Sequence, residues 1–491
     1  MKTNKKTILL ITLIATAVSL FAQDDRPTFE DYTKAKQQGF AQYKKTKEDG
    51  FNEFRRQANE QFAAKMAEAW ALFDMSPAEE EPQLPEPDAP PVKQDDKPQP
   101  DKPVKPNETI EPIAPDTARP MPIPDVPENI PPAAKWLKFS YYNTPCKVRV
   151  DNSLKIRLGS VDEKSVAQAW LQLSGKASDV LVADFARLVD EMRLCDWAVL
   201  DVSKHIAEAF LGKNSNEAVL MQVFLLTQTG HKVRIGRIGE SLVLLAPFAE
   251  KVYRYTYYII DGSEFYNITG ERQGNGCHIY DMAFSGERLM SLRPYPLPLL
   301  AENNGAERTF ASADYPEMKV KVTVNRNLAD FLADYPHCSW ENYVYAGLSE
   351  EVMKTLYPAL HKALKDKPLA EAADMLLNFM HTAFDYKTDH AQFGYERTLF
   401  ADEMFFYSYS DCEDRAILYT ILVRDLLGLD AVLLVYPNHV STAVAIPDAT
   451  GSYLPIAGKR YLMCDPTYIG SHIGDVADSF KDINPDVIKI K

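Results

Sequence analysis

The chain has no excess of positive charge, because its 54 lysines and arginines are outnumbered by 69 aspartates and glutamates. The formal charge of −15 and the lack of a basic patch argue against a nucleic acid as a partner. Cysteine is also scarce: the six residues are scattered along 491 positions and do not form the spacing pattern of a disulfide framework. Pairing of Cys146 with Cys195, or of Cys277 with Cys338, stays open.

Long apolar runs are scarce as well. The apolar segment at residues 8–21 is short for a helix that spans a bilayer, and it follows the basic residues Lys2, Lys5 and Lys6. This arrangement is typical of a signal peptide, and we expect cleavage near Ala22. No cysteine lies at that junction, so a lipoprotein is not predicted. Residues 1–22 therefore predict an exported protein, either periplasmic or extracellular.

Aromatic residues recur every eleven positions in residues 23–75, at Phe29, Phe40, Phe51, Phe62 and Phe73. Eleven residues make three helical turns, so the pattern predicts one apolar stripe along a long amphipathic helix. Such a stripe favours homo-oligomerisation through a right-handed supercoil, or contact with another protein of the cell envelope. The alternative is a single helix that packs on a domain of this same chain.

Residues 76–135 are dense in proline, acidic residues and lysine. A segment of this composition has too little apolar surface to fold on its own, so we expect a disordered, semi-rigid linker. The linker separates the aromatic helix from the part of the chain with a globular composition, which begins near residue 136.

The most informative motif begins at Cys412. Residues 416–427 have apolar side chains at helical spacing, and Gly428 is suited to end the helix. Asp411 precedes the cysteine as a potential helix cap, which places Cys412 at the helix N-terminus. Unpaired amides and the helix dipole favour a thiolate at such a position.

Two residues further along complete a possible triad. Residues 431–436, 439–446 and 460–465 are apolar runs of strand length, and residues 448–458 are predicted to be a loop centred on Gly451. A hairpin folded about this centre brings His439 opposite Asp465, and Cys464 then points to the other face. A thiol nucleophile needs a base and a carboxylate that orients it, so the order Cys412, His439, Asp465 predicts a catalytic triad.

Taken one at a time, these residues have a simpler interpretation, since a single buried cysteine or histidine is most often structural. The combination is more specific than its parts. The following segments match a known pattern: Asp411-Cys412-Glu413-Asp414-Arg415-Ala416, Asn438-His439, Asp465-Pro466-Thr467, Phe384-Asp385-Tyr386 and the segment 392–397.

In these segments the chain resembles the transglutaminase-like superfamily, in particular bacterial transglutaminase-like cysteine peptidases. The resemblance covers roughly residues 350–475, and Ser410 departs from it because the family usually has glycine there. It implies an α+β fold with a papain-like core, in which a helix that carries Cys412 packs on an antiparallel sheet. It also implies acyl transfer through a thioester at Cys412. For the oxyanion, the backbone amide of Cys412 and the side chain of Gln392 are candidates.

A second, degenerate copy is predicted for residues 136–300. Shifting the chain by 198 positions superposes the helix that ends at Gly428 on one that ends at Gly230. In this alignment Asn214 replaces Cys412 and Ser241 replaces His439, and only Asp261 preserves the aspartate. We therefore expect a transglutaminase-like domain without a nucleophile, a β-containing connector at residues 301–345, and the active domain at residues 346–491.

Two classes of function follow. The first is an exported thiol enzyme that cleaves or exchanges amide bonds in a peptide, protein or cell-wall substrate, with a peptidase or amidase favoured over a cross-linking transglutaminase. The second is a non-catalytic binding or scaffold protein of the cell envelope that uses the two domains as interaction modules. No cofactor or metal is expected in either case. The choice between water and an amine as acyl acceptor stays open.

Overall fold

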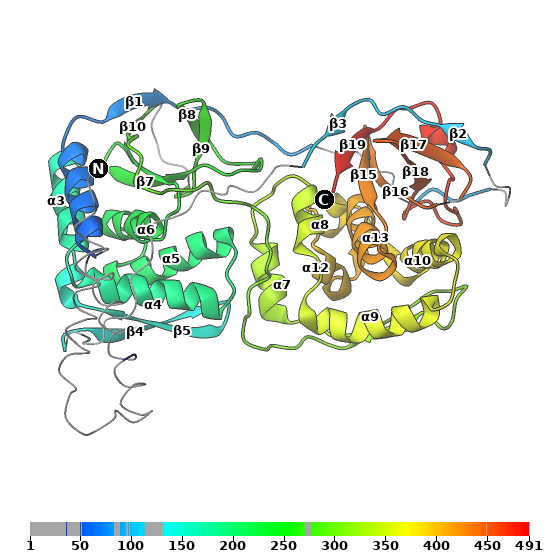
Figure 1. Ribbon diagram of the computed structural model, residues 1–491, viewed down its shortest axis with the longest axis horizontal. Coiled ribbons are helices and arrows are strands. Elements are labelled where there is room, and N and C mark those ends of the chain that lie inside the picture. The colour runs from blue at the N-terminus through cyan, green and yellow to red at the C-terminus, as the bar shows by residue number, and fades with distance from the viewer. Residues whose placement is uncertain are drawn as a thin grey trace, which may run out of the picture. The chain divides into compact units, whose positions relative to one another are not determined.

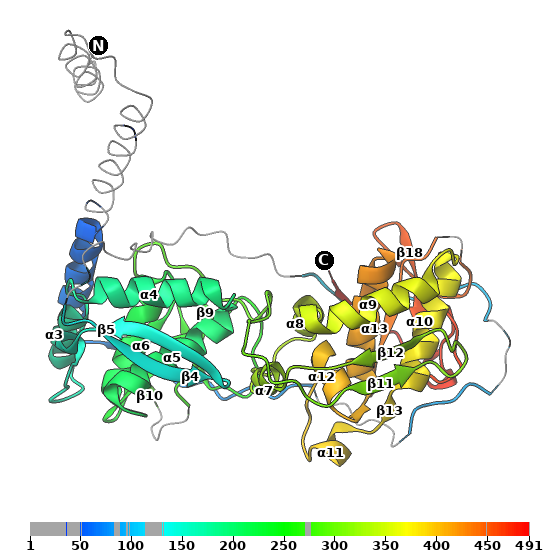
Figure 2. The same ribbon diagram turned by 90° about the horizontal axis from the view of Figure 1, so that it is seen from below.

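The computed structural model describes residues 36, 50, 52–82, 89–94, 97, 99–112, 130, 132–270, 276–447 and 449–490. The chain divides into two compact units, Met1–Gln57 and Ala58–Lys491. The second unit contains two lobes, each with helices packed on a mainly antiparallel sheet (Figures 1 and 2). The broad prediction of an α+β fold is therefore confirmed.

The first lobe has four long helices and a six-stranded sheet. The helices are α3 (Glu163–Leu173), α4 (Ser178–Glu191), α5 (Asp196–Leu211) and α6 (Asn216–Gln228). From one edge the sheet runs β8 (Tyr257–Ile260), β9 (Ser263–Asn267), β7 (Ser241–Ala246), β6 (Arg234–Ile238), β10 (Gly276–Tyr280) and β1 (Ala71–Asp74). A separate hairpin, β4 (Lys135–Tyr141) and β5 (Thr144–Val150), packs on α4 and α5 (Figure 2).

The second lobe repeats this plan with a seven-stranded sheet. From one edge it runs β2 (Lys102–Pro103), β17 (Ser452–Ile456), β18 (Lys459–Cys464), β16 (His439–Val444), β15 (Ala431–Tyr436), β19 (Asp486–Lys489) and β3 (Thr109–Ile110). The helices of this lobe are α8 (Glu341–Ala346), α9 (Glu350–Leu364), α10 (Leu369–Ala383), α11 (Asp389–Gln392), α12 (Ala401–Phe406) and α13 (Cys412–Leu427). A two-residue parallel pair, β13 (Asp385–Tyr386) and β14 (Tyr409–Ser410), leads into α13.

The central helix of each lobe is buried on all sides, as expected for a helix without a polar face. Every residue of α6 from Ala218 to Gln228 is buried, and so is every residue of α13 from Cys412 to Val423. Both helices lie against the hairpin that follows them in the sequence (Figure 1). Each helix therefore fixes the position of its first turn relative to two neighbouring strands.

The two sheets share their strand order and the register of their first hairpin. The order β8-β9-β7-β6-β10-β1 in the first lobe corresponds to β17-β18-β16-β15-β19-β3 in the second, where β2 is added at the outer edge. Ile238 pairs with Ser241 in the first lobe, and Tyr436 pairs with His439 in the second, 198 positions later. One difference is that β1 pairs antiparallel and β3 pairs parallel.

The prediction of one helix over residues 23–75 is wrong at its C-terminal end. The described helix covers residues 52–66, and residues 71–74 form β1, where Phe73 pairs with Cys277. Backbone pairing with the strand β10 at the sheet edge replaces the helix in this segment, and none of the four residues of β1 is buried. Phe29, Phe40 and Phe51 lie outside the described residues.

The prediction of a disordered linker over residues 76–135 is also wrong for several described segments. Ser76 bridges Tyr257 on the first lobe, and Val92 bridges Ile469 on the second. Strands β2 and β3 lie in this segment and extend the second sheet at both edges. The segment has few apolar side chains, so main-chain hydrogen bonds to sheet edges provide the order that its composition does not predict.

The predicted connector over residues 301–345 contains a hairpin, β11 (Arg308–Ala311) and β12 (Lys319–Val322), as well as α7 (Arg326–Ala333) and part of α8. The hairpin packs on α9 and α10, so it belongs to the core of the second lobe (Figure 2). All six cysteines are buried and free, so neither Cys146–Cys195 nor Cys277–Cys338 is a disulfide.

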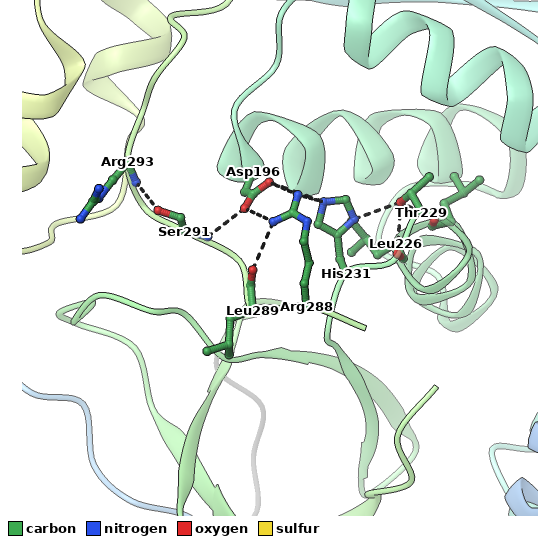
Figure 3. A network of polar contacts seen from close by, with 9 residues as sticks. Asp196, Leu226, Thr229, His231, Arg288, Leu289, Ser291 and Arg293 are labelled. Atoms are coloured by element: carbon green, nitrogen blue, oxygen red, sulfur yellow. Dashed lines mark hydrogen bonds and ion pairs between the residues drawn. The ribbon is translucent and has the colours of Figure 1, made fainter. Parts of the chain in front are cut away.

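A polar network joins the end of α6 to the segment that leaves the first lobe (Figure 3). Arg288 donates two hydrogen bonds to Asp196, at 2.7 and 2.8 Å, and His231 lies between Arg288 and Thr229. Although burial opposes the charged form, the guanidinium of Arg288 and the ring of His231 lower the pKa of Asp196 well below its usual range. The network holds residues 288–291 against the N-terminus of α5.

None of the helices in the described part of the chain is both long enough and apolar enough to cross a membrane.

The helix at residues 52–66 is docked on the first lobe by Phe62. Its ring lies 5.0 Å from that of Trp170, 4.7 Å from that of Tyr280 and 5.2 Å from that of Phe284. We predict that Phe62→Ala lowers the free energy of unfolding by about 3–5 kcal/mol, because it leaves a cavity among three rings. Thermal or denaturant unfolding measures the loss.

The matched control is Phe54→Ala, because Phe54 is 49% exposed on the same helix and should contribute less than about 0.5 kcal/mol. Light scattering on both variants separates docking from self-association. A loss of oligomer in Phe54→Ala, with normal stability in Phe62→Ala, would contradict the docked helix.

Candidate active site

The predicted triad residues come from three elements that meet at one end of the second sheet. Cys412 is the first residue of α13, His439 is the first residue of β16, and Asp465 follows β18 directly. All three side chains are buried, with exposed fractions of 0%, 3% and 5%. The structure thus brings together the helix start, the strand start and the strand end that the sequence predicted.

The imidazole of His439 is bound to the carboxylate of Asp465, with Nε2 2.9 Å from Oδ2. The ring stacks on Phe480, at 4.9 Å between centroids and 8° between planes. The second carboxylate oxygen, Oδ1, accepts the backbone amides of Thr467 at 2.9 Å and Tyr468 at 3.2 Å. Because an ionised carboxylate only accepts, Nε2 carries the proton and Nδ1 is left as the basic nitrogen.

The thiol of Cys412 lies against the strand residue that follows His439. The amide of Val440 donates to Sγ at 3.1 Å, and Sγ also lies 3.3 Å from Oε2 of Glu413. The first contact stabilises negative charge on sulfur, and the second stabilises the neutral thiol, which can donate to the carboxylate. Formation of the thiolate therefore requires a base that takes the proton.

The register of the hairpin differs from the prediction by two residues. Thr442 pairs with Cys464 and Ala443 with Met463, which places Asp465 opposite Ser441 and diagonal to His439. The predicted loop at residues 448–458 contains strand β17, and the turn lies between β17 and β18. A shift of two keeps every side chain on its face, so the His439–Asp465 contact is preserved.

The acidic residues at the start of α13 hold the preceding loop in place. Asp411 Oδ2 accepts the amide of Asp389 at 3.0 Å, and Asp414 Oδ1 accepts the amide of Leu399 at 2.7 Å. Asp389 in turn accepts the amide of Arg397 at 2.5 Å. These bonds fix residues 389–399 to the first turn of the helix that carries the thiol.

Gln392, the predicted oxyanion donor, lies on α11. Its side-chain amide lies 3.4 Å from the carbonyl of Tyr409, three residues before Cys412. Carboxylate oxygens of Asp389, Asp411 and Glu413 lie within 4.8 Å of one another. Oxygen ligands of this kind suit hard cations, but Asp389 and Asp411 already accept the backbone amides of the loop.

His381 was missed by the sequence analysis. It lies on α10, and its Nε2 donates to the backbone carbonyl of Asp465 at 2.9 Å, which holds the main chain at this residue in place. Burial lowers the pKa of His381 to about 4, so the ring is neutral. The pKa of Asp465 is lowered: burial opposes this, but the charge and hydrogen bond of His439 outweigh it. No sequence signal separates His381 from an ordinary residue of an amphipathic helix.

The corresponding place in the first lobe has no thiol. Asn216, the first residue of α6, accepts the amide of Leu242 at 2.8 Å, and Leu242 is the counterpart of Val440. The predicted counterpart Asn214 is instead an exposed loop residue with a φ of 54°. Ser241 does occupy the position of His439, as the first residue of its strand.

The prediction that Asp261 preserves the aspartate in the first lobe is wrong. Asp261 lies in the exposed turn between β8 and β9. The pairing of Leu245 with Asn267 corresponds to that of Ala443 with Met463, and it places Thr269 where Asp465 stands. Thr269 accepts the amide of Leu244 at 2.7 Å, so this lobe satisfies its strand end with a hydroxyl.

The Pro-rich segment lies next to the site. Lys93 forms a buried ion pair with Asp475 at 2.6 Å, and Val104 donates to the carbonyl of Tyr453 at 2.7 Å. Between this segment and the sheet is a cavity of about 200 Å³. Its walls include Phe480, the residue that stacks on His439.

No family model matches the chain, and comparisons with curated proteins and with solved structures found no match either.

The low pKa of His381 predicts a loss of stability on acidification. As pH falls from about 6.5 to about 4, the unfolded chain binds a proton at this histidine and the folded protein does not. Stability is therefore fully present above the unfolded pKa, and about 3 kcal/mol is lost across this window. His381→Gln preserves a donor to Asp465, and we expect it to flatten the curve of unfolding free energy against pH.

The matched control is His361→Gln, because His361 is exposed on α9. Denaturant unfolding at several pH values between 4 and 7 compares the two variants. An unchanged slope in His381→Gln would show that His381 is not the group that titrates.

Proposed function

We propose that the protein is an exported thiol enzyme of the transglutaminase-like type, which cleaves or exchanges amide bonds through a thioester at Cys412. The observation that carries this proposal is the 2.9 Å contact between His439 and Asp465 beside the residue whose amide touches the thiol. Nucleophile, base and orienting carboxylate are the three roles that acyl transfer by a cysteine requires.

The chemistry begins with proton transfer from Cys412 to Nδ1 of His439, since Asp465 occupies Nε2. The thiolate attacks the amide carbonyl, and a C–S bond forms as the carbonyl oxygen takes up negative charge. The protonated His439 then gives its proton to the leaving amine, and the C–N bond breaks. Water or a second amine attacks the resulting thioester, with His439 as base again.

The backbone amide of Cys412, at the start of a buried helix, is the proposed oxyanion donor. Gln392 is a second proposed donor, and it would have to exchange its contact with Tyr409 for one with substrate. A peptide, protein or cell-wall peptide is the proposed substrate class, and hydrolysis is favoured over cross-linking.

The other five thiols are poor candidates for the nucleophile. Burial raises the pKa of Cys146 and of Cys195 to about 11, and that of Cys277 to about 12. Burial also raises the pKa of Cys338 and of Cys464 above the usual range. A thiolate at any of these positions near neutral pH is strongly disfavoured.

A second candidate function is a non-catalytic binding protein of the cell envelope. The observation that favours it is that the first lobe repeats the sheet of the second but has Asn216 instead of a cysteine at the start of its central helix, so one of the two modules serves some purpose other than acyl transfer. The full burial of Cys412 is also compatible with a structural thiol.

Alkylation distinguishes these functions. With iodoacetamide near neutral pH and peptide mapping, we expect Cys412 to react ahead of the five other thiols, and Asp465→Asn to slow the reaction at Cys412 at least about tenfold. On any amide substrate that is turned over, Cys412→Ala should abolish the reaction, while its melting temperature stays close to that of the unmodified protein.

The matched control is Cys464→Ala, which removes a thiol from the same sheet and should leave both alkylation of Cys412 and turnover unchanged. Reaction of Cys412 no faster than of the other thiols would instead favour the binding protein.

A further inference from the structure

A cavity of about 300 Å³ is lined in part by Glu396 and Thr398, which belong to the loop that is bound to the first turn of α13. Two aromatic side chains and four carboxylates line it: Tyr253, Trp340, Glu81, Glu341, Glu396 and Asp486. A small concave site with apolar walls and a few charged groups is the usual form of a small-ligand pocket. Among the described residues that line it, none is a lysine or an arginine.

Three of the four carboxylates have protein partners. Glu81 is bound by Arg254 and lies 2.8 Å from Nδ1 of His337. Asp486 accepts the side-chain amide of Asn107 at 2.7 Å. Glu396 lies 3.7 Å from Nδ1 of His390. These contacts offset the negative charge of the three carboxylates or provide them with hydrogen bonds.

Glu341 is different. It is 93% buried at the start of α8, and apart from its own amide it accepts no hydrogen bond and forms no ion pair within the described chain. The cation that acts on it, Arg293, lies 3.4 Å from Glu250 and is stacked over Tyr345. Burial, together with the charge of Glu250, raises the pKa of Glu341.

A buried carboxylate without a counter-ion is costly, and a bound cation removes this cost. The aromatic walls add to the attraction, because the faces of tryptophan and tyrosine carry negative charge density. Trp340 is held in place by a hydrogen bond from its indole nitrogen to Thr398 at 3.1 Å. The rigid ring and the unpaired carboxylate therefore form a preorganised site for positive charge.

A metal ion is a poorer fit than an organic cation. Within the described residues, potential metal ligands gather within 4.8 Å only at Asp389, Asp411 and Glu413, which do not line this cavity. A divalent ion needs several oxygen ligands at about 2–2.6 Å, whereas an ammonium group needs one carboxylate and apolar walls for its methylene chain.

We propose that this cavity binds a primary ammonium group on an aliphatic chain, such as the side chain of a lysine residue, with Glu341 as its counter-ion. The site also serves the neighbouring thiol as a specificity pocket, and this second part rests on the proposed function. Two lining residues connect the cavity to the candidate site. Thr398 is followed by Leu399, whose amide is bound by Asp414 on the helix of Cys412. Val435 is followed by Tyr436, which pairs with His439.

Binding is tested without chemistry, in the Cys412→Ala protein. Isothermal titration calorimetry compares Nα-acetyl-lysine methylamide with the norleucine analogue, which has the same apolar chain and no charge. We expect the lysine probe to bind one site and the norleucine probe to bind at least about tenfold more weakly. Glu341→Gln in the same background should weaken the lysine probe by about tenfold or more and leave the fold as stable or more stable.

The matched control is Glu371→Gln, on an exposed carboxylate of α10 that pairs with Lys367, and it should leave binding unchanged. Equal binding to Glu341→Gln, or no binding of the lysine probe at millimolar concentration, would overturn the pocket. Binding that depends on Glu341 in a protein whose Cys412 proves inert would preserve the pocket and remove only its link to catalysis.

Discussion

The arrangement of the candidate site depends on how the first turn of α13 is held. Asp411 and Asp414 accept backbone amides of Asp389 and Leu399, so a loop of eleven residues is bound to the helix start by carboxylates that are themselves buried. An amide left without an acceptor at this depth would cost about 1–3 kcal/mol. These hydrogen bonds therefore fix the thiol, the loop that carries Gln392 and one wall of the aromatic cavity together.

The two lobes show how much of this geometry belongs to the backbone. In both, the side chain of the first helical residue meets a backbone amide in the second strand after the helix, as Cys412 Sγ does with Val440 in β16 and Asn216 with Leu242 in β7. A sulfur atom at this place can become a nucleophile, whereas an amide oxygen only satisfies the donor. The fold supplies this position in both lobes, but the first lobe has Asn216, Ser241 and Thr269 where the second has Cys412, His439 and Asp465.

The Pro-rich segment connects features that are distant in sequence. Through β2, β3 and the buried Lys93–Asp475 pair it completes the second sheet at both edges, and it forms one side of the cavity next to Phe480. Glu81, which lies earlier in the same segment, lines the aromatic cavity. A segment with too little apolar surface to fold by itself thus lines both cavities described above.

The sequence by itself determined the local units: a capped helix at Cys412, one strand that begins at His439, another that ends at Asp465, and opposite faces for Asp465 and Cys464. Periodicity and capping reveal these because they depend on neighbours a few residues apart. Only the tertiary structure decided the two-residue shift of the hairpin, the hydrogen bond from His381 to Asp465 and the end of the aromatic helix before Phe73. It also decided that Asn216 and Thr269, and not the predicted Asn214 and Asp261, are the counterparts of Cys412 and Asp465 in the first lobe. The reason is physical: each depends on which sheet edge, helix face or backbone amide a distant segment meets, and such contacts leave no period in the sequence.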